Sequence, residues 1–296
     1  MILNRVLKGA ILVALGASSY GMLATFVKMA YNQNFTTAEV TTAQFILGIL
    51  GLLVINSFQK VKKKNDVVKA TPKNIFQLML AGTSLGMTSL FYYLAVKYIP
   101  VSIGIVLLMQ TVWMGVLLEM MLDKKFPEIK KIVAVVIILI GTVLATDLLK
   151  KDIDLDWRGM IWGMLAAASF TTTMFTANRV ALHVSSAQRS LYMLLGGAVI
   201  VFSFALVTQV TPFNFEIFAK WGIILALFGT IIPPMLMNVG FPLTGIGLGS
   251  IVSAIELPVS ALMAYFLLNE IVSFNQWIGI IIILFAIILM NIKKNN

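Results

Sequence analysis

Long apolar runs alternate with short polar segments along the whole chain, and this pattern predicts helices that cross a membrane. Each run is close to the roughly 20 residues that span a hydrocarbon layer about 30 Å thick as an α-helix. The runs are continuous, whereas membrane strands would alternate residue by residue. Ten spans are expected, at residues 7–31, 38–58, 75–96, 102–122, 129–148, 158–179, 187–209, 217–240, 246–268 and 273–292.

The composition gives the same fold class. Of the 296 residues, 59% are hydrophobic and 11% are charged, and the mean hydropathy is +0.96. A water-soluble chain of this length would leave too much apolar surface outside its core. We therefore expect an all-α polytopic membrane protein with lipid around it. The chain has no cysteine, which excludes disulfides and thiol chemistry.

The basic residues lie mostly on one side of the predicted membrane. Ten spans place both termini on the same side, and sixteen of the 22 Lys and Arg residues fall there, including six lysines in the segment QKVKKKNDVVKATPK. The positive-inside rule then predicts cytoplasmic termini in the cell's cytoplasmic membrane. The net charge of +10 is explained by topology, so a nucleic-acid partner is not expected.

The two halves of the chain resemble each other. KGAILVALGASSY (8–20) aligns with RGMIWGMLAAASF (158–170), and FTTAEVTTAQFILG (35–48) aligns with VSSAQRSLYMLLGG (184–197). Five spans is an odd number, so the second half should enter the membrane in the opposite orientation. The expected units are residues 1–150 and 151–296. Inverted repeats are typical of transporters, whose substrate site lies near the bilayer midplane between the repeats.

The last two spans also resemble a known family. LPVSALMAYFLLNE (257–270) followed by WIGIIIILFAIILM (277–290) is similar to the tail of the drug/metabolite transporter superfamily, in its ten-helix EamA-type branch. The first-half counterpart TVWMGVLLEMMLDKK lacks the proline and carries Asp123 in place of a glutamate, and Gln44 stands where the family often has arginine. The resemblance implies export of small organic metabolites by alternating access, with spans 129–148 and 273–292 at the edge.

Glu256 is the most informative polar residue, because it lies near the middle of the ninth span. A charge there costs roughly 2.5–3.5 kcal/mol, so the side chain should face protein or water. Gly249, Ser253 and Ser260 share its helical face, and Pro258 should kink the helix beside it. Two interpretations stay open: a site for a cation, an ammonium group or a proton, and a protonated glutamic acid packed against a neighbouring helix.

Other polar and aromatic residues fall inside the spans and are candidates for the same binding site. Individually they fit bonds between or within helices, but as a set they predict a hydrated cavity. With Glu256, Ser253 and Ser260, the candidate substrate-binding residues are Ser18, Gln44, Tyr92, Gln110, Trp113, Ser169, Thr173 and Asn238.

Several charged residues and motifs are expected to have structural roles. Glu119 should pair with Lys124 or Lys125, while Arg179 and Arg189 should anchor the helices at the membrane interface. Gly82–Gly86 spells the G-x-S-x-G pattern of serine hydrolases, but it lies within a membrane span and His183 lies in a predicted loop. These glycines, with Gly159–Gly163 and Gly245–Gly249, fit close helix packing.

The sequence therefore predicts a secondary transporter that moves a small organic metabolite, such as an amino acid or another amphipathic amine. Export is the expected direction of transport. The alternatives are a multidrug or organic-cation exporter and, from a different class, an intramembrane serine hydrolase. No cofactor or metal site is expected, because no cysteine cluster, HExxH motif or P-loop is present. Uniport and proton-coupled antiport both fit, as do a monomer and a homodimer.

Overall fold

The computed structural model describes residues 2–62, 68, 70–95, 98–99, 101–145, 156–269 and 272–291, and within these ranges the regular elements are helices. The first half contains α1 (Ile2–Asn32), α2 (Thr37–Lys62), α3 (Pro72–Ala95), α4 (Val101–Leu108), α5 (Thr111–Asp123) and α6 (Ile129–Ala145). The second half contains α7 (Trp157–Arg179), α8 (Ser186–Thr208), η2 (Phe218–Gly222), α9 (Ile223–Ala226), η3 (Leu227–Ile231), α10 (Ile232–Thr244), α11 (Ile246–Ser253), α12 (Glu256–Leu268) and α13 (Phe274–Asn291).

Eight helical stretches in the described part of the chain are long and apolar enough to cross a membrane, so the chain is a multi-pass membrane protein. They correspond to eight of the ten expected spans. The other two expected spans coincide with α6, which has 17 residues, and with the apolar helix at Phe274–Met290. Most of the lysine-rich loop after the second span lies outside the described residues. Glu270, part of the family-like tail, also lies outside them.

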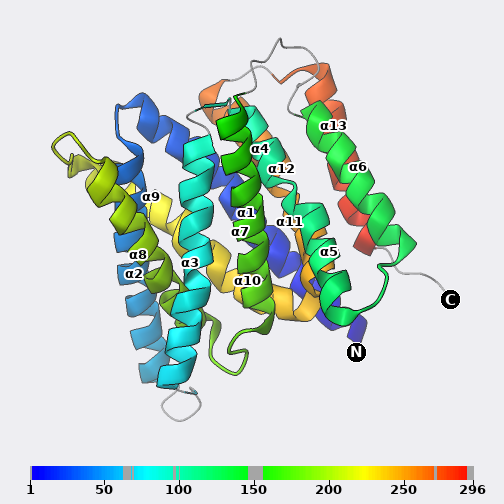
Figure 1. The fold of residues 1–296 in the computed structure, drawn as a ribbon, viewed down its shortest axis with the longest axis horizontal. Coiled ribbons are helices and arrows are strands. Elements are labelled where there is room, and N and C mark those ends of the chain that lie inside the picture. The colour runs from blue at the N-terminus through cyan, green and yellow to red at the C-terminus, as the bar shows by residue number, and fades with distance from the viewer. Residues whose placement is uncertain are drawn as a thin grey trace.

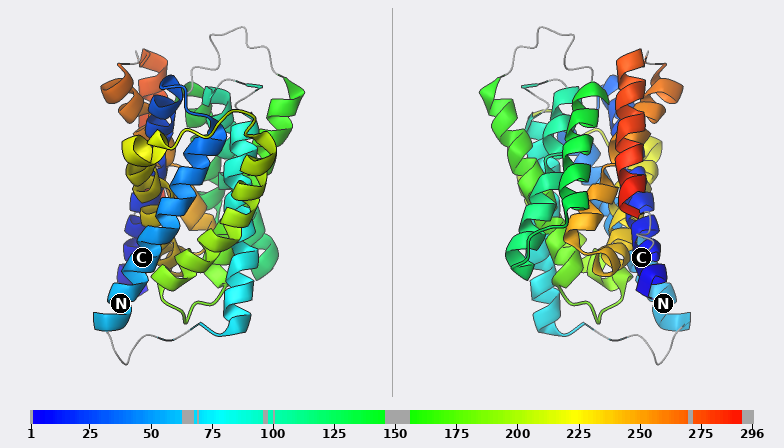
Figure 2. Two further views of the ribbon diagram at one scale, coloured as in Figure 1. Left: turned by 90° about the vertical axis from the view of Figure 1, so that its left-hand side faces the viewer. Right: turned by 90° about the vertical axis from the view of Figure 1, so that its right-hand side faces the viewer.

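The long helices run side by side in one bundle (Figures 1 and 2). α1 begins at one end of the bundle, and the connections from α5 to α6, α7 to α8 and α10 to α11 lie at that same end. We call it the N-terminal end and the other the opposite end. α1 runs away from the N-terminal end, whereas α7, its counterpart in the second half, runs toward it.

Contacts between helices occur in matching pairs across the two halves. α1 packs against α10, α11 and α12, and α7 packs against their counterparts α3, α4 and α5. α2 packs against its own counterpart α8, and α6 packs against α13. α6 and α13 make few other contacts, and many of their large apolar side chains are exposed, as expected for helices at the lipid-facing edge. The packing order is that expected if the halves were exchanged by a two-fold axis.

The starts of α2 and α8 show the same local correspondence. At α2, the Thr36 backbone N–H donates to Glu39 Oε2 (2.8 Å), and the Glu39 backbone N–H donates to Thr36 Oγ1 (3.2 Å). This reciprocal pair is a capping box. At α8, Ser185 Oγ accepts from the Gln188 backbone N–H (3.3 Å). These residues occupy the same positions in the alignment of residues 35–48 with 184–197, so the halves share a helix-start signal as well as apolar runs.

α3 and α8 approach each other as closely as backbones allow. A Cβ atom at Gly82 would lie 1.8 Å from the Met193 carbonyl oxygen, and one at Gly196 would lie 1.8 Å from the Met79 carbonyl oxygen. A Cβ at Gly86 would lie 2.4 Å from the Gly197 carbonyl oxygen. The packing interpretation of Gly82 and Gly86 is thus confirmed, because neither position has room for a side chain.

The start of α7 is fixed by an acidic cap. Asp156 accepts a hydrogen bond from the Arg158 backbone N–H (2.8 Å), and its carboxylate also pairs with the Arg158 guanidinium (Nη2 to Oδ2, 2.6 Å). These hydrogen bonds lower the pKa of the Asp156 carboxyl below its ordinary value of 3.8. The Arg158 guanidinium has the largest effect, and the Arg158 backbone N–H has the next largest. An anion at a helix N-terminus is favourable because it offsets the unpaired amide groups there.

Candidate functional site

Two of the expected spans are broken near their midpoints. A turn at Met109 and Gln110 separates α4 from α5, and a turn at Ala254 and Ile255 separates α11 from α12. Glu256 is the first residue of α12, and Pro258 follows within its first turn, where it cannot donate a backbone hydrogen bond. The kink expected beside Glu256 is therefore present as a break in the helix.

The Glu256 side chain lies at the junction of α12 with α1 and α3. Its Oε2 atom is buried and has no hydrogen-bond partner among the described residues. The backbone lies against α1, since a Cβ at Gly21 would be 2.5 Å from the Glu256 carbonyl oxygen. The hydroxyls of Tyr20 and Tyr92 are close enough to interact electrostatically with the carboxyl group. The acid therefore faces protein, as the membrane argument requires.

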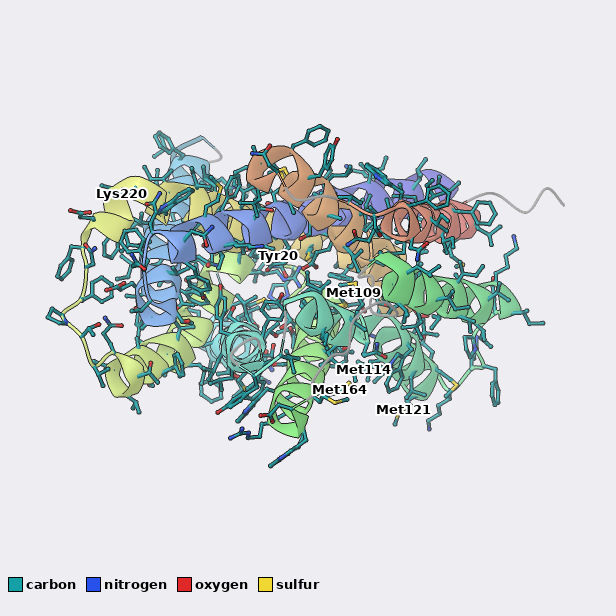
Figure 3. The ribbon with its side chains drawn as sticks, turned by 90° about the horizontal axis from the view of Figure 1, so that it is seen from above. Tyr20, Met109, Met114, Met121, Met164 and Lys220 are labelled. Atoms are coloured by element: carbon teal, nitrogen blue, oxygen red, sulfur yellow. The ribbon has the colours of Figure 1, made fainter. Side chains whose placement is uncertain are left out.

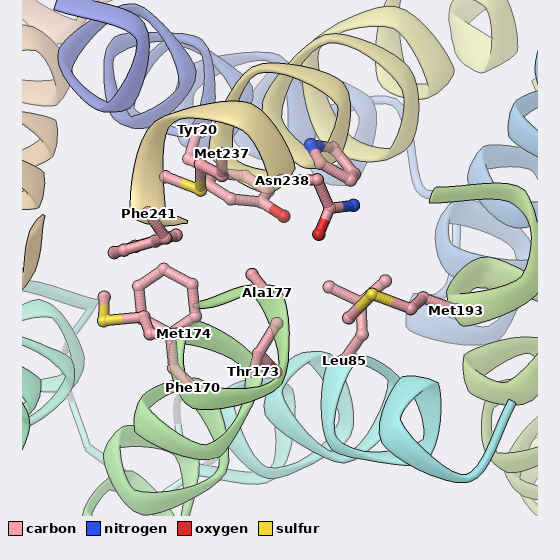
Figure 4. A pocket seen from close by; sticks show the side chains of 11 residues that line it. Tyr20, Leu85, Phe170, Thr173, Met174, Ala177, Met193, Met237, Asn238 and Phe241 are labelled. Atoms are coloured by element: carbon pink, nitrogen blue, oxygen red, sulfur yellow. The ribbon is translucent and has the colours of Figure 1, made fainter. Parts of the chain in front are cut away.

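A small cavity, the central cavity, lies between α1, α3, α7, α8 and α10. Its free space is about 20 Å³, room for roughly one water molecule. Figure 4 shows the Tyr20 ring and the Asn238 carboxamide directed into this space from one side, with Phe170 and Thr173 on the other. The remaining lining is apolar: Leu85, Met174, Ala177, Met193, Pro234, Met237 and Phe241.

Asn238 connects this cavity to a buried cation. Its Nδ2 donates to Ser190 Oγ (2.9 Å), while its buried Oδ1 has no partner among the described residues. Behind it, Arg189 Nη1 donates to the Asn238 carbonyl oxygen (2.6 Å) and Nη2 donates to the Ala177 carbonyl oxygen. Arg189 is only 2% exposed. The expectation that Arg189 is an interface anchor is wrong, because α8 turns its side chain into the bundle.

Hydroxyl groups join α3 to α7 at one wall of the cavity. Ser84 Oγ and Thr173 Oγ1 are 2.8 Å apart, and Ser169 Oγ donates to the Ser84 carbonyl oxygen (2.9 Å). On the outer side of this wall lies a groove of about 330 Å³ between the two helices, and Ser84 and Ser169 contribute to both its lining and these bonds. The hydroxyls serve as connections between helices, and Thr173 alone of the three also lines the central cavity.

The expected span 217–240 contains two π-helical segments, η2 and η3, before α10 begins. π-Segments leave backbone carbonyls outside the regular ladder and often mark functional positions, and here Ser19 Oγ donates to the Phe228 carbonyl oxygen (3.0 Å). Gln44 packs against Gly229 in η3, and its buried Oε1 lacks a partner among the described residues. Pro233 and Pro234 lie in the first turn of α10, and the chain passes from η3 into α10 without leaving the helical conformation.

The structure brings together part of the predicted site. Asn238 and Thr173 line the central cavity, and Ser169 lies next to Thr173. Tyr92 lies near Glu256, whereas Gln110 and Trp113 bond to each other (2.8 Å) at the break between α4 and α5. Ser253 bonds to its own helix at the Gly249 carbonyl oxygen (2.9 Å).

Of the eleven candidates, only Asn238 and Thr173 line the central cavity. Gln44 lies at η3, and Ser18 and Ser260 do not line the cavity. Sequence reasoning missed Tyr20, which lines the cavity beside Glu256. Its signal was an aromatic residue directly after Ser18 and Ser19 in the first span.

The N-terminal end of the bundle is closed by contact of α5 with α11. A Cβ at Gly115 would lie 2.6 Å from Ser250 Cβ, and Ser250 Oγ donates to the Val112 carbonyl oxygen (3.2 Å). At the opposite end, α4 and α12 make no comparable contact among the described residues. Viewed along the bundle from that end, Tyr20 and Met109 lie toward the middle and Lys220 lies at the rim (Figure 3).

Glu119 takes part in this closure in a way the sequence did not suggest. It forms an ion pair with Lys131, so the expected pairing with Lys124 or Lys125 is wrong. Its carboxylate also lies against the first residues of α11: Cβ atoms at Gly245 and Gly247 would come within 2.6 and 2.4 Å of its two oxygens. Gly245, directly before α11, has a φ of 81°. Glycine adopts this backbone conformation readily because it has no Cβ atom. Arg179 pairs with Asp123 (3.0 Å) and is exposed.

The hydrolase interpretation has no geometry to support it. Ser84 is bonded to Thr173 and to the Ala81 carbonyl oxygen. His183 Nε2 lies 2.8 Å from Asn74 Nδ2, at the start of the same helix. A nucleophilic serine needs a base within hydrogen-bond reach, and these two residues bond to different partners.

Comparisons with known proteins agree with this architecture. The profile of the EamA-like transporter family matches residues 7–146 and 157–292, once in each half of the chain. A solved structure titled only "Crystal structure of protein" superposes with a TM-score of 0.70 at 15% sequence identity, covering 97% of each chain. At that identity the likeness concerns the fold. No curated protein matches the chain.

Proposed function

Because the chain belongs to the EamA-like transporter family, whose members are transporters and not enzymes, we propose that it is a secondary transporter for a small amphipathic metabolite bearing an amine, such as an amino acid. Transport proceeds by alternating access across the cytoplasmic membrane, with net movement outward and both termini in the cytoplasm. The observation that carries the proposal is the central cavity lined by Tyr20, together with the nearby Glu256, whose buried Oε2 has no partner among the described residues.

We infer an inverted repeat of five plus five spans, an architecture that fits this mechanism. The family profile matches twice, the counterpart helices α1 and α7 run in opposite directions, and the helix contacts occur in matching pairs. In such transporters one repeat moves against the other around a fixed midplane site. The two broken spans fit this role, since broken helices present backbone groups to a substrate or ion at that depth.

The difference between the two ends of the bundle supports a specific state. A two-fold exchange of the halves would convert the α5–α11 contact into an α4–α12 contact. The first is present, and the second is not found in the described part of the chain. We assign this conformation to the state that is closed toward the N-terminal end, which is the cytoplasmic side in our orientation.

The chemistry of the cavity favours an amphipathic substrate. Methionine and phenylalanine side chains provide an apolar wall, and one amide, two hydroxyls and a nearby carboxyl provide polar contacts. A cationic drug would also satisfy Glu256, so a multidrug or organic-cation exporter is the second candidate. It is favoured if transport does not require a carboxylate on the substrate.

Reconstituted protein tests the proposal directly. Liposomes are loaded with one unlabelled compound, and counterflow of labelled amino acids and of a labelled organic cation is measured with and without a proton gradient. Uptake of amino acids above that of empty liposomes is the expected result. Counterflow of the organic cation alone would select the second candidate, and no counterflow of any compound would contradict the transport proposal.

A further inference from the structure

Arg189 is a charged residue that the proposed function does not yet use. It is almost fully buried, and no carboxylate lies within ion-pair distance of it among the described residues. A guanidinium carries five N–H donors, and two of them are used, on the Ala177 and Asn238 carbonyl oxygens. Its Nε has no partner in the part of the chain that the structure describes. Burial of an unpaired charge inside a membrane protein is costly and is usually linked to function.

A purely structural role accounts for part of this arrangement. Ala177 lies near the C-terminal end of α7, where a cation is favourable because the helix presents unpaired carbonyls. Lysine or a neutral donor could provide that contact with fewer unused donors. The remaining donors of Arg189, and the Asn238 Oδ1 that lacks a partner among the described residues, are available to a ligand.

The position of Arg189 points to that ligand. Both residues whose carbonyls it binds line the central cavity, so the guanidinium lies directly behind one wall of the cavity. On the α1 side, the Glu256 backbone lies against Gly21, the residue that follows the cavity-lining Tyr20. Arg189 and Glu256 are thus a cation and an acid near the cavity, and neither forms an ion pair within the described part of the chain. Figure 4 shows that the Asn238 and Tyr20 side chains project into the same space.

We propose that the substrate is zwitterionic and that Arg189 binds its carboxylate. The carboxylate would accept hydrogen bonds from Arg189, a geometry that a guanidinium can satisfy with two parallel bonds. The ammonium group would donate to Asn238 Oδ1 and pair with Glu256. The present cavity is too small for such a ligand, so the site must widen when the bundle opens. This inference rests on the proposed function and makes it more specific, since it requires both charges on one substrate.

Four related probes separate the two ends of the ligand. L-Leucine carries both charges, leucine methyl ester and 3-methylbutylamine carry only the cation, and 4-methylpentanoate carries only the anion. Binding to purified full-length protein is read from the ligand-dependent rise in unfolding temperature. We expect the wild type to bind leucine at least about tenfold more tightly than each single-charge probe, since each lost contact is a charged hydrogen bond.

Variants assign each end to its residue. Arg189→Gln should lose the preference for leucine over the ester but keep the preference for leucine over 4-methylpentanoate. Glu256→Gln should do the reverse. A residue that only ties helices together would weaken all four probes equally. Arg189→Lys retains a cation and should retain part of the preference, so it provides the test if Arg189→Gln does not fold.

Three results would overturn the inference. They are a wild type that binds the amine as tightly as leucine, a wild type that binds none of the four probes, and an Arg189 variant with unchanged preference. The first result leaves the transport proposal intact and selects the organic-cation candidate. Failure of the transport proposal would instead be seen as absence of counterflow, whatever the binding preferences are.

Discussion

Glu119 on α5 forms an ion pair with Lys131 on α6 while its carboxylate lies against Gly245 and Gly247 at the start of α11. Both side chains are about one-fifth exposed, at 17% and 21%. The pair thus joins three helices at the end of the bundle that is closed. In an alternating-access protein, contacts made in one state only determine how the two states are populated.

The first prediction concerns this pair. Glu119→Gln should weaken the closure at the N-terminal end and raise the population of the state open there by roughly threefold to tenfold, because a partly exposed ion pair contributes about 1 kcal/mol. The measurement is the distance distribution between spin labels on α5 and α11. Asp123→Asn is the matched control. Its partner is Arg179 and both side chains are half exposed, so no change is expected. Equal effects of the two substitutions would contradict the assignment of Glu119.

Glu256→Gln is the second prediction. Removal of the negative charge should reduce counterflow of an amine-bearing probe at least about tenfold, since a charged hydrogen bond contributes roughly 1.5–3 kcal/mol. Folding should persist, because the amide is neutral and the buried Glu256 Oε2 has no partner to lose among the described residues. Glu216→Gln is the control, since Glu216 pairs with Lys220 on the exposed surface. Unchanged counterflow in Glu256→Gln would exclude this residue from the binding site.

A third prediction tests the contact of α3 with α8. Gly82→Ala should destabilise the protein by at least about 3 kcal/mol, because the added methyl would collide with a backbone oxygen that cannot rotate away. Thermal unfolding in detergent and the folded fraction after gel filtration provide the measurement. Leu80→Ala lies within the same turn but faces outward, with 62% of its side chain exposed, and should have little effect. A stable Gly82→Ala protein would mean that the two helices lie further apart.

The cap at the start of α7 makes a prediction about pH. The pKa of Asp156 is lower in the folded protein than in the unfolded chain, chiefly because of the Arg158 guanidinium. The stabilisation it provides should therefore be complete above the ordinary pKa of 3.8 and should disappear as the pH falls through the lower folded value. Unfolding temperatures of wild type and Asp156→Asn should differ at pH 6 and converge as the pH falls below the ordinary pKa of 3.8 and through the lower folded value. A difference that grows on acidification would contradict the cap.

Much of the fold could be predicted from the sequence. A helix that crosses lipid must be long and apolar, and the long apolar runs separated by short polar segments show such helices directly. The helix break beside Glu256 could also be predicted, because Pro258 removes a backbone donor at a known position. The inward direction of Arg189 could not, since it depends on the rotation of α8 about its axis. The predicted span 187–209 placed Arg189 near its end. A basic residue at such an end is typical of an interface anchor.

The lining of the central cavity was predicted in part. Asn238 and Thr173, which line it, were candidates because they are polar side chains inside apolar spans. Their separation from Gln44 and Gln110 depends on which faces of the helices meet, and a single sequence does not record this. Glu119 was assigned to nearby Lys124 or Lys125, but the left-handed backbone at Lys124 (φ 51°) ends α5, and the chain then returns Lys131 to its side.

The most direct test of alternating access uses one cysteine in the central cavity. The chain contains no cysteine, so Thr173→Cys provides a unique thiol, and its modification by a membrane-impermeant maleimide can be timed from each side of oriented liposomes. We predict that adding Glu119→Gln raises the rate from the N-terminal side and lowers it from the opposite side. Rates that rise together from both sides, or that do not respond, would contradict alternating access.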